Sequence, residues 1–216
     1  MIIQNGLVFT EEECFTPLTI RTDQYQITAL TANDRIPAPE ESEPVIDASG
    51  CFVIPGLTDI HFHGCDGYDF CDNSLTAYEK IAAFCLKNGV TSICPATMTM
   101  PEKTLIDICR TAASFHSMQA EKKAYTDCAD LIGIHMEGPY INKAKKGAQN
   151  ASYVRTPSEC EIERYLTLSE GLVKLISLAP ELPNALSVIK KYKDKTAFSI
   201  AHTQADYETA LAAMNA

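Results

Sequence analysis

Hydrophobic and polar positions change their pattern near residue 50. Before it, short apolar stretches such as 7–9 and 18–20 alternate with polar turns, as in short β-strands. A proline- and glutamate-rich stretch, 37–41, follows them. After residue 50, apolar runs alternate with amphipathic stretches, which is typical of buried parallel strands joined by crossover helices. We therefore expect a small β-structured part, residues 1–50, and an α/β part, residues 51–216.

The second part contains five apolar runs that predict strands. They are 51–60, 90–96, 131–136, 172–178 and 196–201. Amphipathic stretches follow them, and their predicted helix caps are Ser74, Thr156 with Pro157, and Thr203 with Asp206. A closed (β/α)8 barrel needs eight strand-helix units, typically in about 250 residues. The sheet is therefore either an open, doubly wound one or the first part of a barrel.

Three histidines and one acid follow the apolar runs. His61 and His63 are two positions apart at the carboxyl end of the first predicted strand, so both side chains project from one face. Glu137 follows the third run and His202 the fifth. The carboxyl ends of parallel strands share one edge, where α/β folds place their sites, so we expect the four side chains to converge. The alternative for His61 and His63 is a pair of packed core histidines.

These donors are of the kind that binds a divalent metal ion. A buried carboxylate is costly unless it is paired or metal-bound, and imidazole with carboxylate suits Zn²⁺ or a similar metal with open positions for water. Such a metal lowers the pKa of bound water to ~7 and supplies hydroxide for attack on an acyl carbon. His135 could be a further ligand, but it is interpreted either as packed inside the sheet or as a support for Glu137. His116 is interpreted as part of a helix surface.

Composition narrows the possible partners. The 216 residues include 18 Lys plus Arg against 28 Asp plus Glu, a net charge of −10, which argues against nucleic acids and anionic membranes. With 46% hydrophobic residues, no leader pattern and no long apolar run, we expect a cytoplasmic globular protein. Nine cysteines without CxxC spacing predict reduced thiols. The lysines of 143–146 and Arg155 form either a patch that attracts an anionic small molecule or a solvated basic loop.

Several motifs together resemble the amidohydrolase superfamily, and within it the N-acetylglucosamine-6-phosphate deacetylase family. The motifs are 53–64, 89–92 with 95–97, 133–140 with 145–148, 178–181, and 201–203. The H-x-H pair indicates only the superfamily, whereas 135–140 combined with 145–148 is much more specific. The resemblance covers the whole chain.

The resemblance implies an incomplete (β/α)8 TIM-type barrel in residues 51–216, and a small β-sandwich to which residues 1–50 contribute. It implies hydrolysis of an anionic amino-sugar phosphate, N-acetylglucosamine 6-phosphate, to glucosamine 6-phosphate and acetate, by a full-length form that is a homodimer. His61, His63, Glu137 and His202 would then be ligands of one or two divalent ions, most simply Zn²⁺, with Fe²⁺ as another candidate.

The sequence departs from this family in two respects. Ala148 and Gln149 match the stretch that contacts the sugar, but the family usually has His at position 149, and Gln carries no charge. The family's general acid/base Asp comes from a later strand, and this chain ends before it, so we assign no catalytic residue and expect the chain alone to be nearly inactive. Two alternatives are a non-catalytic metal-binding or association remnant of the fold, and an amidohydrolase acting on a cyclic amide.

Overall fold

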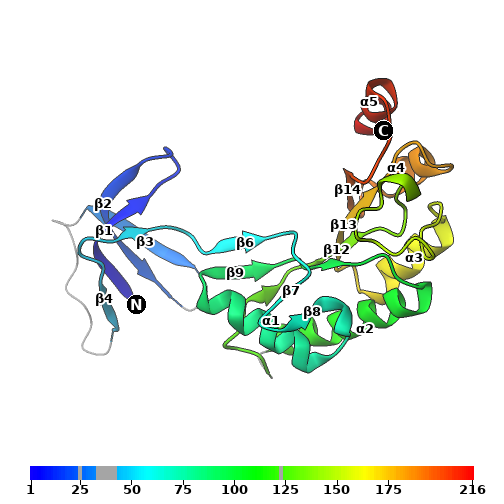
Figure 1. The fold of residues 1–216 in the computed structure, drawn as a ribbon. Helices are drawn as coiled ribbons and strands as arrows, with labels where there is room; N and C mark the ends of the chain where they lie inside the picture. The colour runs from blue at the N-terminus through cyan, green and yellow to red at the C-terminus, as the bar shows by residue number, and fades with distance from the viewer. Residues whose placement is uncertain (24–25, 33–42, 122–123) are drawn as a thin grey trace. The chain divides into compact units, whose positions relative to one another are not determined.

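The computed structural model describes residues 1–23, 26–32, 43–121 and 124–216 (Figure 1). The chain forms two compact units, Met1–Gly56 and Leu57–Ala216. The proline- and glutamate-rich stretch 37–41 lies outside the described residues. The assignment of the two parts to a sandwich domain and a hydrolase barrel domain stays a prediction.

The first unit is a five-stranded sheet. Its strands are β1 (Ile2–Phe9), β2 (Phe15–Thr22), β3 (Ile27–Ala32), β4 (Val45–Asp47) and β5 (Phe52–Val53). The order is β3-β2-β1-β4, with antiparallel pairing among the first three and with β4 and β5 parallel to β1. Ile2 and Val8 of β1 are buried, whereas Leu7 and Phe9 are exposed. The short strands expected in this part of the chain are therefore confirmed.

The predicted strand 51–60 is wrong as a single element. Its first residues form β5 in the sheet of the first unit, and only Leu57–Asp59 form β6 in the second. Pro55 and Gly56 separate the two strands, and a proline lacks the N–H that a continuous ladder requires. The apolar pattern indicated extended chain correctly but not which sheet each half joins.

The second unit consists of five successive strand-helix units. They are β6 (Leu57–Asp59) with α1 (Leu75–Lys87); β9 (Val90–Ile93) and β10 (Ala96–Thr97) with α2 (Glu102–Ala120); β11 (Asp130–Leu131) and β12 (Ile134–Glu137) with α3 (Glu159–Leu168); β13 (Val173–Leu178) with α4 (Ala185–Tyr192); and β14 (Ala197–Ile200) with α5 (Tyr207–Met214). The loops add β7 (Gly64–Cys65), β8 (Tyr68–Asp69) and the 3-10 turns η2 (Phe70–Asp72) and η3 (Lys143–Lys145). Among the described helices, none combines the length and apolar character needed to span a bilayer.

The strands of these units are parallel and form two ladders, β11-β9-β6 and β10-β12-β13-β14. The helices α1, α2 and α3 run along the same side of the strands (Figure 1). Side chains alternate along β12, so Met136 belongs to the buried apolar core while His135 and Glu137 share the opposite face. This alternation sets the positions of the functional side chains.

The N-terminal cap of α1 is the predicted residue, whereas the caps of α3 and α5 differ from the prediction. Ser74 caps α1 as predicted, because its hydroxyl accepts the amide hydrogen of Ala77. Ser158, not Thr156, caps α3, since the helix begins directly after it. Asp206 alone caps α5. Thr203, the other predicted cap, donates its hydroxyl to a carboxylate of a neighbouring loop instead.

Candidate metal centre

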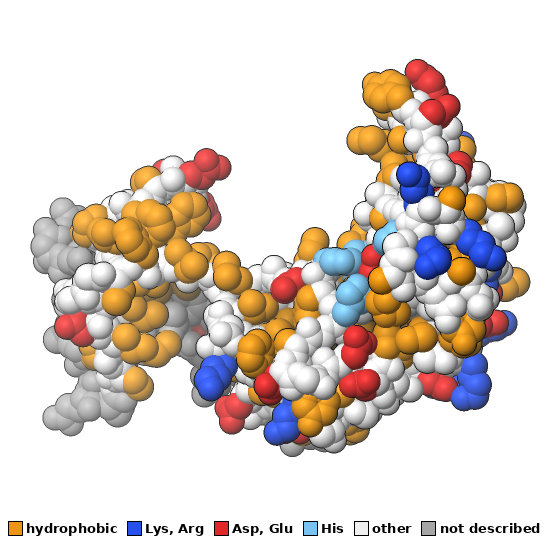
Figure 2. Space-filling model, viewed as in Figure 1, with side chains coloured by type: hydrophobic (Ala, Val, Ile, Leu, Met, Phe, Trp, Pro, Cys, Tyr) orange, Lys and Arg blue, Asp and Glu red, His pale blue; other side chains and the backbone are white. Residues whose placement is uncertain are grey.

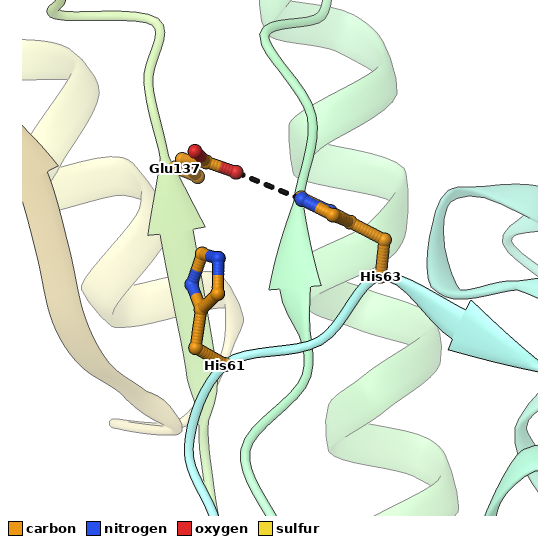
Figure 3. Close-up of side chains that lie close together, drawn as sticks. All are labelled: His61, His63 and Glu137. Carbon is orange, nitrogen blue, oxygen red and sulfur yellow. Dashed lines mark ion pairs between the residues drawn. The ribbon is translucent and has the colours of Figure 1, made fainter. Parts of the chain in front are cut away.

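Glu137 is the last residue of β12 and stands at the carboxyl edge of the parallel sheet, where it is only 9% exposed. His61 and His63 lie in the segment directly after β6, and His202 follows β14. The predicted first strand does not reach the two histidines, yet both imidazoles point toward Glu137 (Figure 3). Figure 2 shows histidine side chains gathered beside acidic atoms on this face.

The carboxylate of Glu137 lies between two imidazoles. His63 Nε2 is 2.9 Å from Glu137 Oε2, and His202 Nε2 is 2.6 Å from Oε1. The donor atoms of His61, His63 and Glu137 all lie within 4.8 Å of one another. Two ligands bonded at about 2.0 Å to a tetrahedral ion are about 3.3 Å apart, so this spacing suits a single cation. The group could hold a metal ion.

Backbone carbonyls orient two of the rings. His63 Nδ1 is 3.2 Å from the carbonyl oxygen of Ala96, and His202 Nδ1 is 2.8 Å from that of Lys145. A carbonyl only accepts, so each Nδ1 carries the hydrogen and donates it. Both Nε2 atoms then face Glu137. A ring fixed through Nδ1–H with Nε2 free to coordinate is the usual arrangement of a metal-binding histidine.

One oxygen of Glu137 lacks a hydrogen bond. Oε2 is buried, and among the described residues no donor meets it at a favourable angle, although His63 Nε2 is 2.9 Å away. A buried carboxylate oxygen without a hydrogen bond is costly. A cation beside Oε2 would remove this cost, so the donor set and its buried oxygen fit a divalent metal.

The electrostatics of Glu137 and His202 are coupled. Burial alone raises the pKa of Glu137, but the hydrogen bond from His202 and the positive charge of the imidazoles lower this pKa below its ordinary value. Burial alone lowers the pKa of His202, but its bonds to Glu137 and to the carbonyl of Lys145 raise this pKa above its ordinary value. Without a metal, the carboxylate therefore favours the protonated form of His202, and a metal ion competes with the proton on Nε2.

His135 is a buried support, but for a different partner than expected. Its Nε2 is 2.7 Å from the Ser177 hydroxyl, and its Nδ1 is 3.1 Å from both the carbonyl of Ile60 and His61 Nδ1. Burial lowers the pKa of His135, so the ring is neutral. His135 is therefore packed inside the sheet, as one of the two interpretations expected. Its interpretation as a support for Glu137 is corrected, because in the described part of the chain the hydrogen-bond partners of its ring are Ser177, the carbonyl of Ile60 and His61.

Comparison with known proteins shows which enzymes this chain is homologous to. The chain is 28% identical over 209 residues to the N-acetylglucosamine-6-phosphate deacetylase of Bacillus subtilis (strain 168). The aligned region is 95% of this chain and 51% of the relative. The chain is 30% identical over 164 residues to the deacetylase of Lysinibacillus sphaericus, in an alignment that covers 76% of this chain and 41% of the relative. The chain is a homologue of the N-terminal half of these deacetylases. No protein-family model matches it.

Solved structures give the fold of this deacetylase homologue. The N-acetylglucosamine-6-phosphate deacetylase of Pasteurella multocida superposes with a TM-score of 0.85 at 25% identity, over 99% of this chain and 54% of that one. The enzyme of Mycobacterium smegmatis gives 0.84 at 24% identity, over 100% and 53%. The chain spans about half the length of the relatives it matches. The predicted α/β fold, an incomplete (β/α)8 TIM-type barrel with an N-terminal sheet, is confirmed.

Ala148 and Gln149 of the deacetylase homologue lie in the loop that orients His202. Gln149 is 3% exposed, and its Oε1 accepts the amide hydrogen of Thr99 at 2.6 Å. Ala148 is exposed, and its neighbour Gly147 lies against the ring of His202. The side-chain oxygen of Gln149 thus ties this loop to the segment after β10. Contact of either residue with a substrate stays a prediction.

The expected positive patch is smaller than the sequence indicated. Arg155 donates to the Glu161 carboxylate at 3.0 Å and to the carbonyl of Met100 at 3.1 Å. Its guanidinium therefore binds groups within the protein, and the prediction that Arg155 belongs to a positive patch is wrong. Lys143 and Lys145 are exposed on the loop that follows Glu137.

Sequence reasoning missed three polar residues around this centre. Ser177 orients His135, and the Asp59 carboxylate accepts the amide hydrogen of His61 at 3.0 Å. Glu181 joins the loops next to His202. Each stands at or just beyond the carboxyl end of a strand, so the position that singled out Glu137 was the available signal.

Proposed function

We propose that this chain carries the metal-binding part of a hydrolase that deacetylates N-acetylglucosamine 6-phosphate in amino-sugar breakdown. The observation that carries the proposal is the approach of His63 and His202 to the Glu137 carboxylate, beside His61. It occurs in a chain that matches a deacetylase over 95% of its length. The Mycobacterium smegmatis relative was solved in complex with N-acetyl-D-glucosamine-6-phosphate, which supports this substrate.

Zn²⁺ is the metal we favour. Imidazole nitrogens and a carboxylate are ligands that Zn²⁺ takes in catalytic sites, and Fe²⁺ or another divalent ion accepts the same donors. One ion fits the group around Glu137, and a second is compatible with the four donors His61, His63, Glu137 and His202. When bound, such an ion supplies Lewis acidity that polarises an amide carbonyl and activates water at neutral pH.

The chain's own residues bind and orient. Glu137 offers two oxygens between His63 and His202, whose rings are held by backbone carbonyls. Lys143 and Lys145 place positive charge on the adjoining loop in a chain of net charge −10, which favours the approach of a sugar phosphate.

The aspartate expected to transfer the proton has no counterpart among these contacts in the residues that the structure describes. In the described part of the chain, none of the side-chain hydrogen bonds or ion pairs of His61, His63, Glu137 and His202 involves an aspartate. General acid–base catalysis by a positioned side chain contributes on the order of 10²–10⁴ in rate. We expect this chain alone to bind metal and release little acetate.

The test is metal content after zinc loading and desalting, measured by plasma mass spectrometry on the wild type and on Glu137→Ala. The wild type should retain close to stoichiometric zinc and the variant far less. Glu163→Ala serves as the control, because Glu163 is half-exposed and pairs with Lys195 on the surface. Equal zinc in the wild type and Glu137→Ala would remove Glu137 from the centre. Rapid acetate release from N-acetylglucosamine 6-phosphate by this chain alone would contradict the expected low turnover.

A second candidate function is association with a second copy of this chain. Phe9, Phe15 and Phe52 are exposed on the first unit and contact one another, with ring centroids 5.4 and 4.7 Å apart. A contiguous exposed aromatic patch is typical of an interaction surface. Light scattering tests it, because a monodisperse monomer at high concentration would argue against self-association.

A further inference from the structure

Glu181 joins three loops at the edge of the sheet that carries Glu137. Its Oε1 accepts hydrogen bonds from Asn142 Nδ2 and from the amide of Gln204, both at 2.8 Å. Its Oε2 accepts the hydroxyl hydrogen of Thr203 at 2.5 Å. One carboxylate thus links the loops that follow β12, β13 and β14.

These hydrogen bonds surround the backbone of His202. Thr203 and Gln204 follow it directly, and the amide of Asn142 donates to the His202 carbonyl at 2.9 Å. His202 has a φ of 49°, in the left-handed region that a non-glycine residue keeps only where its surroundings hold it. Glu181 restrains this backbone directly through Thr203 and Gln204, and it holds the side chain of Asn142, whose amide binds the His202 carbonyl.

The same carboxylate also reaches the ring of His202 through Asn142. Asn142 Oδ1 accepts the amide hydrogen of Ala144 at 2.8 Å, and its carbonyl accepts that of Lys145 at 2.9 Å. This turn places the Lys145 carbonyl 2.8 Å from His202 Nδ1. Glu181 and Asn142 therefore fix both the backbone and the ring orientation of the histidine.

Glu181 is ionised in this setting. Burial raises its pKa, but the hydrogen bonds from Thr203, Gln204 and Asn142 outweigh burial and lower the pKa below its ordinary value. Bonds to an ionised carboxylate are stronger than neutral ones, so a charged residue holds the three loops better than its amide.

We propose that Glu181 is a positioning residue of the metal centre, which holds His202 so that Nε2 reaches Glu137. The inference rests on the proposed function, since it assigns a role within the same centre. Among the described residues, none of the hydrogen bonds of Glu181 reaches His61, His63 or Glu137. Glu181 therefore acts on the centre only through the loops that carry and orient His202.

Zinc titration by calorimetry tests the effect on affinity. Glu181→Ala should weaken Zn²⁺ binding about 10- to 100-fold, the usual effect of removing a group that orients a ligand. Glu181→Gln keeps an oxygen in the place of Oε1, which serves Asn142 and Gln204, so its loss should be smaller than that of Glu181→Ala. Glu163→Ala, which removes a surface partner of Lys195, should bind zinc like the wild type.

A double-mutant cycle with His202→Ala separates positioning from general destabilisation. Because Glu181 acts through His202, Glu181→Ala should weaken zinc binding no further once His202 is alanine. An equal fold-loss in both backgrounds would overturn the inference.

Hydrogen-deuterium exchange of the metal-free protein gives a readout that does not need zinc. In Glu181→Ala, the amides of Asn142 and Gln204 should exchange faster than in the wild type, whereas those within α2 should not change. If the wild type fails to bind zinc, the proposed function fails, and the exchange still tests the role of Glu181. Unchanged exchange at Asn142 and Gln204 would overturn that role, as would faster exchange with undiminished zinc affinity.

Discussion

Replacing Glu137 by glutamine should remove the stabilisation that zinc gives to the second unit. Glutamine keeps the size of the side chain and one acceptor oxygen, but it removes the charge. In the metal-free protein the change weakens the 2.6 Å contact with His202. Hydrogen bonds to charged groups contribute about 1.5–3 kcal/mol, and burial of Glu137 protects this one from solvent. The metal-free variant should therefore be less stable by roughly this amount.

Zinc should widen the difference. At a free concentration 100 times the dissociation constant, a ligand adds about 2.7 kcal/mol to the free energy of unfolding. For a unit the size of Leu57–Ala216, each kcal/mol shifts the melting temperature by about 2–4 °C. The wild type should therefore gain about 5–11 °C. If the variant binds about 100-fold more weakly, it gains only about 0.4 kcal/mol, or about 1–2 °C.

Differential scanning calorimetry with zinc and with a chelator measures both quantities. Glu163→Gln is the matched control, because it changes a glutamate of the same unit whose partner Lys195 is exposed. Its zinc-induced shift should equal that of the wild type. A full zinc-induced shift in Glu137→Gln would refute the assignment of Glu137 as a ligand.

Three further predictions concern pH, backbone conformation and thiols. The pKa of Glu137 is lowered and that of His202 is raised, so the pair stabilises the metal-free protein most between about pH 5 and 6. Calorimetry should show stability falling below about pH 4.5 as Glu137 protonates, and above about pH 6.5 as His202 loses its proton. The fall above about pH 6.5 should be smaller in His202→Gln. Gly138→Ala should destabilise by about 2–5 kcal/mol in urea unfolding, because φ is 82° and the new methyl would collide with Thr99 Oγ1; Gly171→Ala, at φ 79° with open space, should cost only the backbone part. Burial raises the pKa of Cys109 to about 12, so a thiol reagent at pH 8 should modify the exposed cysteines well before the buried ones, and equal rates would contradict the packing; the exposed ones are Cys14, Cys51 and Cys160, the buried ones Cys85, Cys94 and Cys109.

The alternation of strands and helices, and the meeting of the four polar side chains, followed from sequence for a physical reason. Parallel strands place their carboxyl ends at one edge, so residues directly after strands meet even when they are far apart in the chain, as Glu137 and His202 do. Approximate strand ends suffice for this convergence, so the side chains meet although β6 stops before His61 and His63.

The sequence did not reveal which group Arg155 binds, or which sheet each half of residues 51–60 joins. Arg155 was expected to face solvent, but Glu161 lies within 3.0 Å of it only because α3 packs beside that loop. Residues 51–60 formed one apolar run, yet hydrogen bonding distributes them between two sheets. The partners of residues 51–60 are strands remote in sequence, and Arg155 binds the remote carbonyl of Met100 as well as Glu161 six residues ahead. The local apolar and polar pattern encodes neither outcome.

Two imidazole rings of the centre are oriented by backbone carbonyls rather than by side chains. Ala96 and Lys145 hold the rings of His63 and His202 through their carbonyl oxygens, which every residue type possesses. No motif can reveal such contacts, because the information lies in backbone position alone. That position is set in turn by side chains beside the centre, among them Gln149, which binds the amide of Thr99, and Glu181. Polar residues around the centre therefore set the geometry that brings Glu137 and its histidines together. Each of them lies at the end of a strand or in the loop beyond it.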